Sequence, residues 1–384
     1  MAEPLTTDML LDMARKQAGL DDFGDEYFRE SLDKLLSCVQ KEVAYTPSGW
    51  NGFIASSVGL LVNRLRIVRD LKAHPEILDE DVSDPIIILG LVRTGTSKLQ
   101  MMMAADPRFR ALQGWQAYFP GRIVESNDPA SDPRPEMARE MFAALHRNAP
   151  EFSAGHPMFA DQTEEETRIL HLSFSSWMGW VSNPSDSFYE WAKEQDESKS
   201  YEFFVKVLKY LQWQEGGRKG RRQVLKTPMH LRTADLLVKY FPKATLVHCH
   251  RQPADFVRSW VRLQDLIWQM GQEQTDPARC RRSALEVWGD ALKKFLAYRE
   301  QMGSDLNVVD VYFEEIRDDP IKAISRVYSA AGVELTLESE AAMLAWNASH
   351  PPHRAGKMEY HEELYGVTPE MVNTCFADYL AKFY

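Results

Sequence analysis

The sequence predicts an α/β fold in which a parallel sheet is flanked by helices. Four short apolar runs rich in β-branched residues lie at 85–89, 223–226, 244–249 and 307–311. Continuous apolar runs of this length are typical of strands that are buried on both faces of a parallel sheet. Each run is followed by a loop and then by a helical pattern, and this alternation favours a sheet with helices on both faces.

The N-terminal 80 residues lack such runs and are expected to form a helical layer. Apolar side chains recur there at the three- and four-residue spacing of amphipathic helices. They are Leu10, Leu11, Met13, Ala14, Phe28, Leu32, Leu35, Leu36, Leu60, Leu61, Leu65 and Val68. We interpret this layer as packing material rather than as a carrier of catalytic residues.

The segments after the four runs place the helices of the α/β core. Helical patterns are expected at 97–105, at 231–240, from 254 onward and at 321–330. The stretch 106–222, between the first two strands, is helical and rich in aromatic residues. We expect it to be an insertion that builds a pocket beside the sheet.

Composition and charge exclude several classes of protein. The 384 residues are 44% hydrophobic, enough for a sizeable core, and the net charge of −11 disfavours nucleic-acid binding. Four cysteines without C-x-x-C spacing predict neither a disulfide framework nor a zinc site. The longest strongly apolar run, 85–92, is far shorter than the roughly 20 residues that cross a bilayer, and the N-terminus has no secretory pattern. We therefore expect a cytoplasmic protein without stable membrane insertion.

The loop after the first strand has the spacing of an anion site. Gly90 and Gly95 stand where the phosphate-binding pattern G-x-x-x-x-G-K-[ST] has its glycines. A loop between a strand and a helix aims backbone N–H groups and a helix N-terminus at a bound anion. Thr96 occupies the lysine position of that pattern, and Arg93 lies inside the loop instead. A P-loop-like phosphate site is predicted; a kinase or NTPase, which needs the lysine, and an ordinary strand–helix turn stay as alternatives.

Two motifs resemble the sulfotransferases that use 3′-phosphoadenosine 5′-phosphosulfate (PAPS) as donor. The loop G-L-V-R-T-G-T-S at 90–97 is similar to the 5′-phosphosulfate loop of bacterial members, G-x-P-R-S-G-T-T, with Val92 in place of the proline. Arg251 at a strand end and Ser259 eight residues later resemble the family's 3′-phosphate element. A guanidinium fork and a helix-borne hydroxyl suit a terminal phosphate. Supporting matches lie at 19–24, 224–231, 313–320, 353–354 and 365–370.

The resemblance implies roles for these residues. Arg93 is expected to act catalytically on the bridging oxygen and on the charge that develops on the leaving phosphate. The implied cofactor-binding residues are Arg93, Thr94, Gly95, Thr96, Ser97, Lys98, Arg251, Ser259 and Arg354. PAPS is the implied donor and 3′-phosphoadenosine 5′-phosphate (PAP) the product. No metal is implied, because a sulfonate carries less charge than a phosphoryl group.

The general base stays open among several candidates. Relatives use a histidine directly after a K-T pair, but Pro228 follows that pair here. His230, two residues further on, could serve as the base or could pack against the following helix. His156 and Glu165, with Glu164 beside it, are the other candidates. An acidic pair at a helix start is also typical of a solvated surface.

The division of the chain follows from these assignments. We expect one sulfotransferase domain over 1–384, made of an N-terminal layer (1–80), a cofactor core (81–105 and 223–335), an acceptor-site insertion (106–222) and a C-terminal segment (336–384).

The expected acceptor is a small apolar or aromatic molecule that carries a hydroxyl. Aromatic side chains crowd the stretch 177–213. We expect most of them in the core, while some could line an apolar pocket. A nucleotide-binding protein without catalysis stays an alternative function, and a homodimer is left open.

Overall fold

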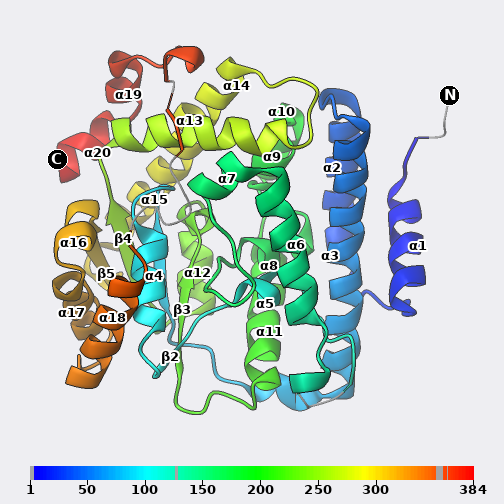
Figure 1. The fold of residues 1–384 in the computed structure, drawn as a ribbon, viewed down its shortest axis with the longest axis horizontal. Helices are drawn as coiled ribbons and strands as arrows, with labels where there is room; N and C mark the ends of the chain where they lie inside the picture. The colour runs from blue at the N-terminus through cyan, green and yellow to red at the C-terminus, as the bar shows by residue number, and fades with distance from the viewer. Residues whose placement is uncertain (1–3, 126–128, 352–357, 361) are drawn as a thin grey trace.

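The computed structural model describes residues 4–125, 129–351, 358–360 and 362–384. Five parallel strands form one sheet in the order β2-β3-β1-β4-β5. The strands are β1 (Ile86–Gly90), β2 (Phe109–Arg110), β3 (Arg222–Lys226), β4 (Thr245–His250) and β5 (Val308–Tyr312). Helices surround this sheet, as Figure 1 shows, and the predicted α/β fold is confirmed.

Four of the strands lie where the apolar runs predict them. The fifth, β2, was not predicted because two residues leave no run to detect; it pairs with β3 through Phe109 and Arg222. The expected helix at 231–240 is also shorter than predicted. A 3₁₀ turn at Pro228–Leu231 comes first, and α12 (Ala234–Tyr240) begins three residues later than expected.

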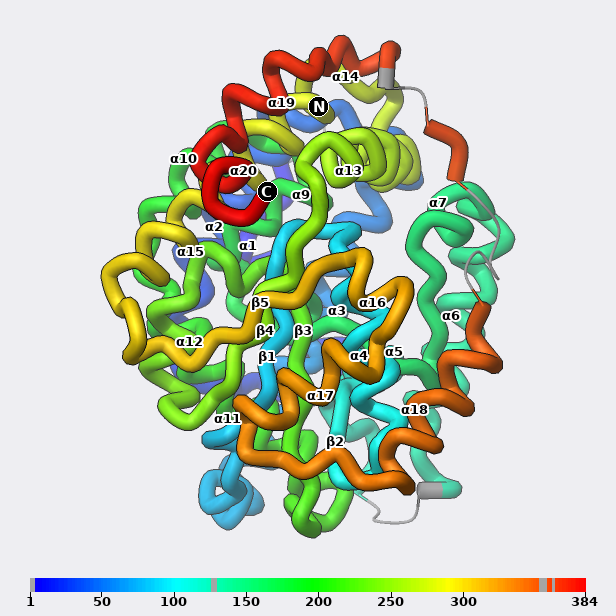
Figure 2. Tube along the Cα trace, turned by 90° about the vertical axis from the view of Figure 1, so that its left-hand side faces the viewer, coloured from blue at the N-terminus to red at the C-terminus, as the bar shows by residue number. Residues whose placement is uncertain are grey.

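The central strand β1 joins two apolar cores, one on each face of the sheet. Ile86 and Ile88 belong to the core shared with α4 (Thr96–Ala104) and α17 (Pro320–Ala330), which lie on that face in Figure 2. The alternate residue Ile87 belongs to the larger core on the other face. Each buried isoleucine stabilises the fold by about 1.5–3 kcal/mol relative to exposure. Burial on both faces explains why the run is continuously apolar.

The predicted N-terminal layer consists of α1 (Thr7–Ala18), α2 (Phe28–Glu42) and α3 (Pro47–Ala73), which stand at one side of the molecule in Figure 1. The hydroxyl of Thr6 caps α1 by accepting a hydrogen bond from Met9 N. Of the apolar positions predicted to pack, Leu10 is fully buried, whereas Met13 is 41% exposed. The spacing therefore identified the helix but included one outward-facing residue.

The remaining helices form the insertion and the flanks of the sheet. Those of the insertion are α5 (Gly114–Tyr118), α6 (Arg134–Asn148), α7 (Pro150–Gly155), α8 (Thr167–Leu170), α9 (Gly179–Ser182), α10 (Asp186–Ala192) and α11 (Ser198–Gln214). The others are α13 (Pro253–Gln269), α14 (Pro277–Arg282), α15 (Trp288–Met302), α16 (Phe313–Asp318), α18 (Leu337–Ser349), α19 (Pro369–Cys375) and α20 (Ala377–Phe383). Within the described ranges, no helix is both long and apolar enough to cross a membrane.

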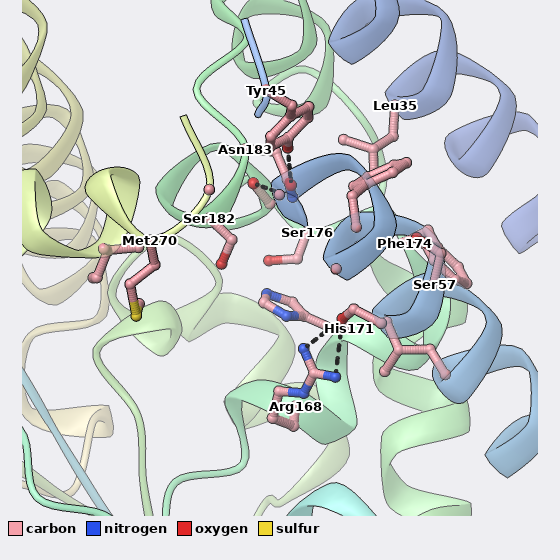
Figure 3. Close-up of a pocket in the computed structure, with 18 of the residues that line it drawn as sticks. Leu35, Tyr45, Ser57, Arg168, His171, Phe174, Ser176, Ser182, Asn183 and Met270 are labelled. Carbon is pink, nitrogen blue, oxygen red and sulfur yellow. Dashed lines mark hydrogen bonds between the residues drawn. The ribbon is translucent and has the colours of Figure 1, made fainter. Parts of the chain in front are cut away.

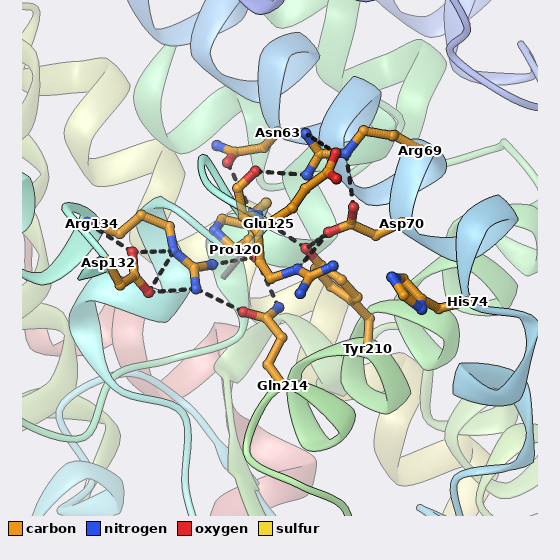
Figure 4. A network of polar contacts seen from close by, with 12 residues as sticks. Asn63, Arg69, Asp70, His74, Pro120, Glu125, Asp132, Arg134, Tyr210 and Gln214 are labelled. Carbon is orange, nitrogen blue, oxygen red and sulfur yellow. Dashed lines mark hydrogen bonds and ion pairs between the residues drawn. The ribbon is translucent and has the colours of Figure 1, made fainter. Parts of the chain in front are cut away.

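A buried ionic network fastens α3 to the insertion (Figure 4). The carboxylate of Asp70, only 2% exposed, accepts hydrogen bonds from Arg69 Nε (2.8 Å), Arg122 Nε (2.9 Å) and the Tyr210 hydroxyl (2.6 Å). Burial alone would raise the pKa of Asp70, but these three donors outweigh it and lower the pKa. Asp70 is therefore ionised and paired at neutral pH, and it ties three segments that are distant in sequence.

Candidate functional site

The order of the strands brings three loops together at one edge of the sheet. Central β1 lies between β3 and β4, and all three strands are parallel, so their carboxyl ends meet. Ligands of open α/β sheets bind in the crevice at such carboxyl ends. The residues that close the three strands are Lys226 on β3, Gly90 on β1 and His250 on β4, which Arg251 follows.

The loop after β1 has a backbone that only glycine permits at two points. Gly90 has φ +147°, and a Cβ there would lie 2.5 Å from the carbonyl oxygen of Cys249. Gly95 has φ +87° at the start of α4, where a Cβ would lie 3.1 Å from Ile316 Cδ1. This tight turn aims the N-terminus of α4 at the crevice, which favours a bound anion there.

The hydroxyl side chains of the loop do not all face the crevice. The Thr94 hydroxyl is buried and donates a 2.7 Å hydrogen bond to the Leu91 carbonyl, so it stabilises the turn from inside. Thr96 begins α4, and Ser97 and Lys98 line the crevice. Burial lowers the pKa of Lys98 from its ordinary value. Of the loop's predicted ligands, Arg93, Ser97 and Lys98 therefore present side chains to the crevice.

Arg93, Arg251 and Ser259 are brought together although they are up to 166 positions apart. Arg93 Nε donates to Ser259 Oγ at 3.2 Å, and Arg93 NH1 donates to the Gly155 carbonyl at 2.8 Å. Arg251 NH1 donates to the Arg93 carbonyl at 2.8 Å, and its guanidinium stacks over the Phe313 ring at 4.1 Å. The two predicted phosphate elements thus form one surface. The predicted Arg354 lies outside the described residues.

A cavity of about 370 Å³ adjoins this surface at Arg93, whereas Arg251 and Ser259 do not line it. Arg93, Ser97, Lys98, His156, Glu164 and Lys226 contribute polar groups to its wall. None of the aromatic residues of 177–213 lines it. The residues predicted to fill the core behave as expected, since Trp177, Trp180, Phe188 and Phe204 are at most 1% exposed.

Lys226 lines the crevice, although the sequence motifs predict no role for it. Its side chain is 3% exposed, and Nζ donates to Ser97 Oγ at 3.2 Å and to the carboxylate of Glu165. Its backbone N–H donates to both carboxylate oxygens of Glu166, at 3.1 and 2.9 Å. The available signal was a lysine that ends a strand in the segment V-L-K-T-P. Recognising it required knowing that β3 lies beside β1.

Three consecutive glutamates beside Lys226 differ in ionisation. Burial, helped by the charge of Glu165, raises the pKa of Glu164 to about 7. Burial would also raise the pKa of Glu165, but the charge of Lys226 and the hydrogen bonds from Lys226 and Thr167 lower it. Burial raises the pKa of Glu166 to about 8. At neutral pH, Glu165 is therefore the carboxylate that carries the stabilised negative charge.

The two candidate histidines have different surroundings. His156 lines the cavity, and burial, opposed by Glu165 and supported by Lys226 and Arg93, lowers its pKa to about 4. It is therefore neutral at pH 7 and able to accept a proton. His230 does not line the cavity; it is fully buried, and its Nδ1 lies 2.7 Å from the Tyr201 hydroxyl. Of the two candidate histidines, His156 therefore lines the crevice and His230 does not.

A cluster of metal-ligand type lies at β4 and β5, outside the crevice. His248, His250 and Asp310 place ligand atoms within 4.8 Å of one another. Arg299, however, donates to Asp310 Oδ1 at 2.7 Å and Oδ2 at 3.0 Å, and its NH1 lies 2.9 Å from His248 Nδ1. The Arg299 guanidinium therefore occupies the hydrogen-bonding capacity of the Asp310 carboxylate that a metal ion would use. His250 Nδ1 also contacts the Tyr379 hydroxyl at 2.9 Å, which anchors the C-terminal α20 behind Arg251.

Comparison with known proteins points to one family. A family model described as "Sulfotransferase family" matches residues 85–337. The solved structure of sulfotransferase STF1 from Mycobacterium tuberculosis H37Rv is similar with TM-score 0.86 and 29% identity, covering 98% of this chain and 100% of that chain. Sulfotransferase STF9 from Mycobacterium avium is similar with TM-score 0.88 and 28% identity, covering 100% of this chain and 98% of that chain. A search of curated proteins finds no match.

Proposed function

Because the chain belongs to the sulfotransferase family, we propose that it moves a sulfonate group from PAPS to a hydroxyl of a small apolar or aromatic acceptor. One observation carries the choice of donor. Arg93, Arg251 and Ser259 meet beside a glycine loop at the carboxyl ends of β1 and β4. This arrangement offers cationic and hydroxyl donors at two neighbouring positions, as a ligand with a phosphosulfate and a separate phosphate requires.

The residues present fit such a donor. Arg251 Nε is buried and donates no hydrogen bond to any described residue; it lies 3.6 Å from Asp255 Oδ2, an ion pair whose acidic place a bound phosphate would share. We assign the 3′-phosphate to Arg251 and Ser259. The 5′-phosphosulfate is assigned to the N-terminus of α4, together with Ser97 and Lys98. Bound there, PAPS would supply an electrophilic sulfur joined to a phosphate leaving group.

Arg93 and Lys226 are the cations proposed to stabilise charge on the bridging oxygen. Both side chains are fixed before any ligand binds, Arg93 by Gly155 and Ser259, Lys226 by Ser97 and Glu165. Charges that are already oriented cost little reorganisation when charge develops in the transition state.

His156 is the proposed general base. It accepts the proton of the acceptor hydroxyl while the new oxygen–sulfur bond forms and the bond from sulfur to the phosphate oxygen breaks. Glu165, ionised beside Lys226, favours protonation of His156 and so stabilises the imidazolium that results. Met101 and Phe159 line the same cavity and offer an apolar surface to the rest of the acceptor.

The proposed function is tested by incubating the purified chain with PAPS and a panel of alcohols and phenols, with a chelator present. We expect PAP release that depends on the acceptor, with a mass increase of one sulfonate on the product. The measurement is mass spectrometry of both products. PAP binding without turnover on any acceptor would support a nucleotide-binding protein instead, and absence of PAP binding would reject the donor assignment.

Replacing Arg251 with alanine is expected to weaken PAP binding by about 1.5–3 kcal/mol, the range of a hydrogen bond to a charged group. This corresponds to an increase in Kd of roughly 10- to 150-fold. Isothermal titration calorimetry measures the change. Arg15→Ala removes a charge on α1, in the N-terminal layer and not among the residues that line the crevice, and serves as the control. Equal affinity of Arg251→Ala and wild type would reject the 3′-phosphate assignment.

A further inference from the structure

A second cavity, of about 320 Å³, lies between α3 and the segment that follows α8 (Figure 3). Gly52 and Phe53 of α3 form one wall, and His171 and Phe174 form the opposite one. Residues 270–271, after the C-terminal end of α13, close one side. The cavity shares no lining residue with the crevice at the phosphate loop. Its volume is in the range of small-molecule sites.

The lining combines an apolar body with a cationic, hydroxyl-rich part. Apolar surface comes from Leu35, Phe53, Leu60, Phe174, Ile267 and Met270. Arg168 is the charged side chain among the lining residues, and Ser56, Ser176 and Ser182 add hydroxyls to the wall. Figure 3 shows Ser176 and Ser182 beyond the His171 ring as seen from Arg168. No carboxylate from the described ranges lines the cavity.

Arg168 has no acidic partner within the described part of the chain. Its NH1 and NH2 both donate to the single hydroxyl of Ser56, at 3.3 Å, and its guanidinium stacks over the Tyr118 ring at 5.0 Å. Arg168 Nε is buried and has no hydrogen-bond partner there. A guanidinium carries five N–H donors, so most of its capacity is unused. A cation without a counterion at a cavity wall favours an anionic ligand.

His171 adds a second unused polar group to the same wall. Its Nε2 is buried and has no partner among the described residues. Burial, supported by the charge of Arg168, lowers the pKa of His171 to about 3, so the ring is neutral at pH 7. A neutral imidazole complements an oxygen ligand without adding a second charge.

We propose that this cavity binds a small amphiphile with an apolar body and a carboxylate head. The head pairs with Arg168 and the Ser56 hydroxyl, while the body packs against the apolar residues around Phe53. The carboxylate head is chosen for charge complementarity, because the described lining residues include one cation without an acidic partner, Arg168, and no carboxylate. The site lies one residue from Thr167, whose hydroxyl contacts the Glu165 carboxylate (3.0 Å) and Thr227 Oγ1 (2.9 Å). The segment 164–171 therefore connects the two, because Glu164 lines the crevice and Arg168 and His171 line the second cavity.

Filling the cavity tests the proposal directly. Gly52 lines the cavity, and a Cβ there would meet no atom within 4 Å, so Gly52→Leu adds side-chain volume at the cavity wall without a backbone clash. Leucine also suits a helix interior better than glycine. Calorimetric titration of the full chain with decanoate is expected to show binding to wild type and at least tenfold weaker binding to Gly52→Leu. The control is Gly59→Leu, because Gly59 is on the same helix, has the same open space and does not line the cavity. It is expected to bind as wild type does.

Charge recognition is tested by a second variant. Arg168→Gln is expected to weaken decanoate binding at least tenfold, and decyltrimethylammonium is expected not to bind wild type. Circular dichroism and thermal melts establish that each variant is folded. Lack of decanoate binding to wild type, or equal binding to wild type and Arg168→Gln, would overturn the proposal. These titrations use neither PAPS nor turnover, so their outcome is separate from that of the sulfotransferase assay.

Discussion

Replacing Arg93 with alanine is expected to lower kcat by about 100- to 1,000-fold, the usual effect of removing one preorganised group that stabilises transition-state charge. Affinity for PAP should change by less than tenfold, because the α4 N-terminus, Arg251 and Ser259 remain. The reason lies in the position of Arg93. Its guanidinium is fixed by Gly155 and Ser259 beside the loop, where the bond to the leaving phosphate is assigned. Turnover rates from PAP release and calorimetric PAP titration measure the two effects.

Two comparisons sharpen this prediction. Arg93→Lys keeps the charge but loses the planar fork that contacts Gly155 and Ser259 together, so we expect only partial recovery of kcat. Arg251→Ala should show the opposite division, with weaker PAP binding and a smaller effect on kcat. If Arg93→Ala weakened PAP binding as much as Arg251→Ala and left kcat unchanged, Arg93 would be a binding residue only.

The fold was largely predictable because its main signal is local. The run at 85–89 is continuously apolar since β1 is covered on both faces, with Ile86 and Ile87 in different cores. Every position of β1 is buried, and the strand consists of apolar residues and glycine. β2 could not be predicted because its two residues are paired to β3 by tertiary contact alone, and two residues hold no periodicity.

The site was predictable only where its residues follow a motif along the chain. The glycine spacing and Arg93 lie within one loop, and Arg251 with Ser259 lie within one strand–helix unit, so sequence alone finds them. The contact between Arg251 and the carbonyl of Arg93 depends on β4 pairing with β1. Lys226 depends in the same way on β3 lying on the other side of β1. Such neighbours follow from strand order, which one sequence does not display.

The ionisation of the candidate bases could not be predicted for a different reason. The sequence does not distinguish the three consecutive glutamates at 164–166, yet their pKa values differ. The charge of Lys226 lowers the pKa of Glu165, whereas burial outweighs the effect of Lys226 on Glu164 and Glu166 and raises their pKa values. His156 and His230 are likewise equivalent until burial places one at the cavity wall and the other against Tyr201.

His156 gives the most direct test of the proposed base. Replacing it with glutamine should lower kcat/KM by about 100- to 10,000-fold, the contribution of a positioned general base. The wild-type pH profile should also carry its signature. A base works only when neutral, and burial lowers the pKa of His156 to about 4, so kcat/KM should stay level from pH 7 down to about 5 and fall as the pH passes through about 4. An unperturbed histidine would instead lose activity near its ordinary pKa of about 6.5.

Three measurements separate this from acid unfolding and from the other candidates. Activity is measured after brief exposure to each pH and again after return to pH 7, so that only the reversible loss is attributed to titration. His74→Gln alters a histidine that does not line the crevice and whose ring is tilted against Trp213, 4.7 Å between centroids, so it should leave both rate and profile unchanged. Glu165→Gln removes the charge that favours the imidazolium form of His156. It should therefore shift the acidic fall of kcat/KM to lower pH while leaving His156 in place. Full activity in His156→Gln would reject His156 as the base. An acidic fall in activity that disappears in Glu165→Gln and persists in His156→Gln would assign the role of base to Glu165.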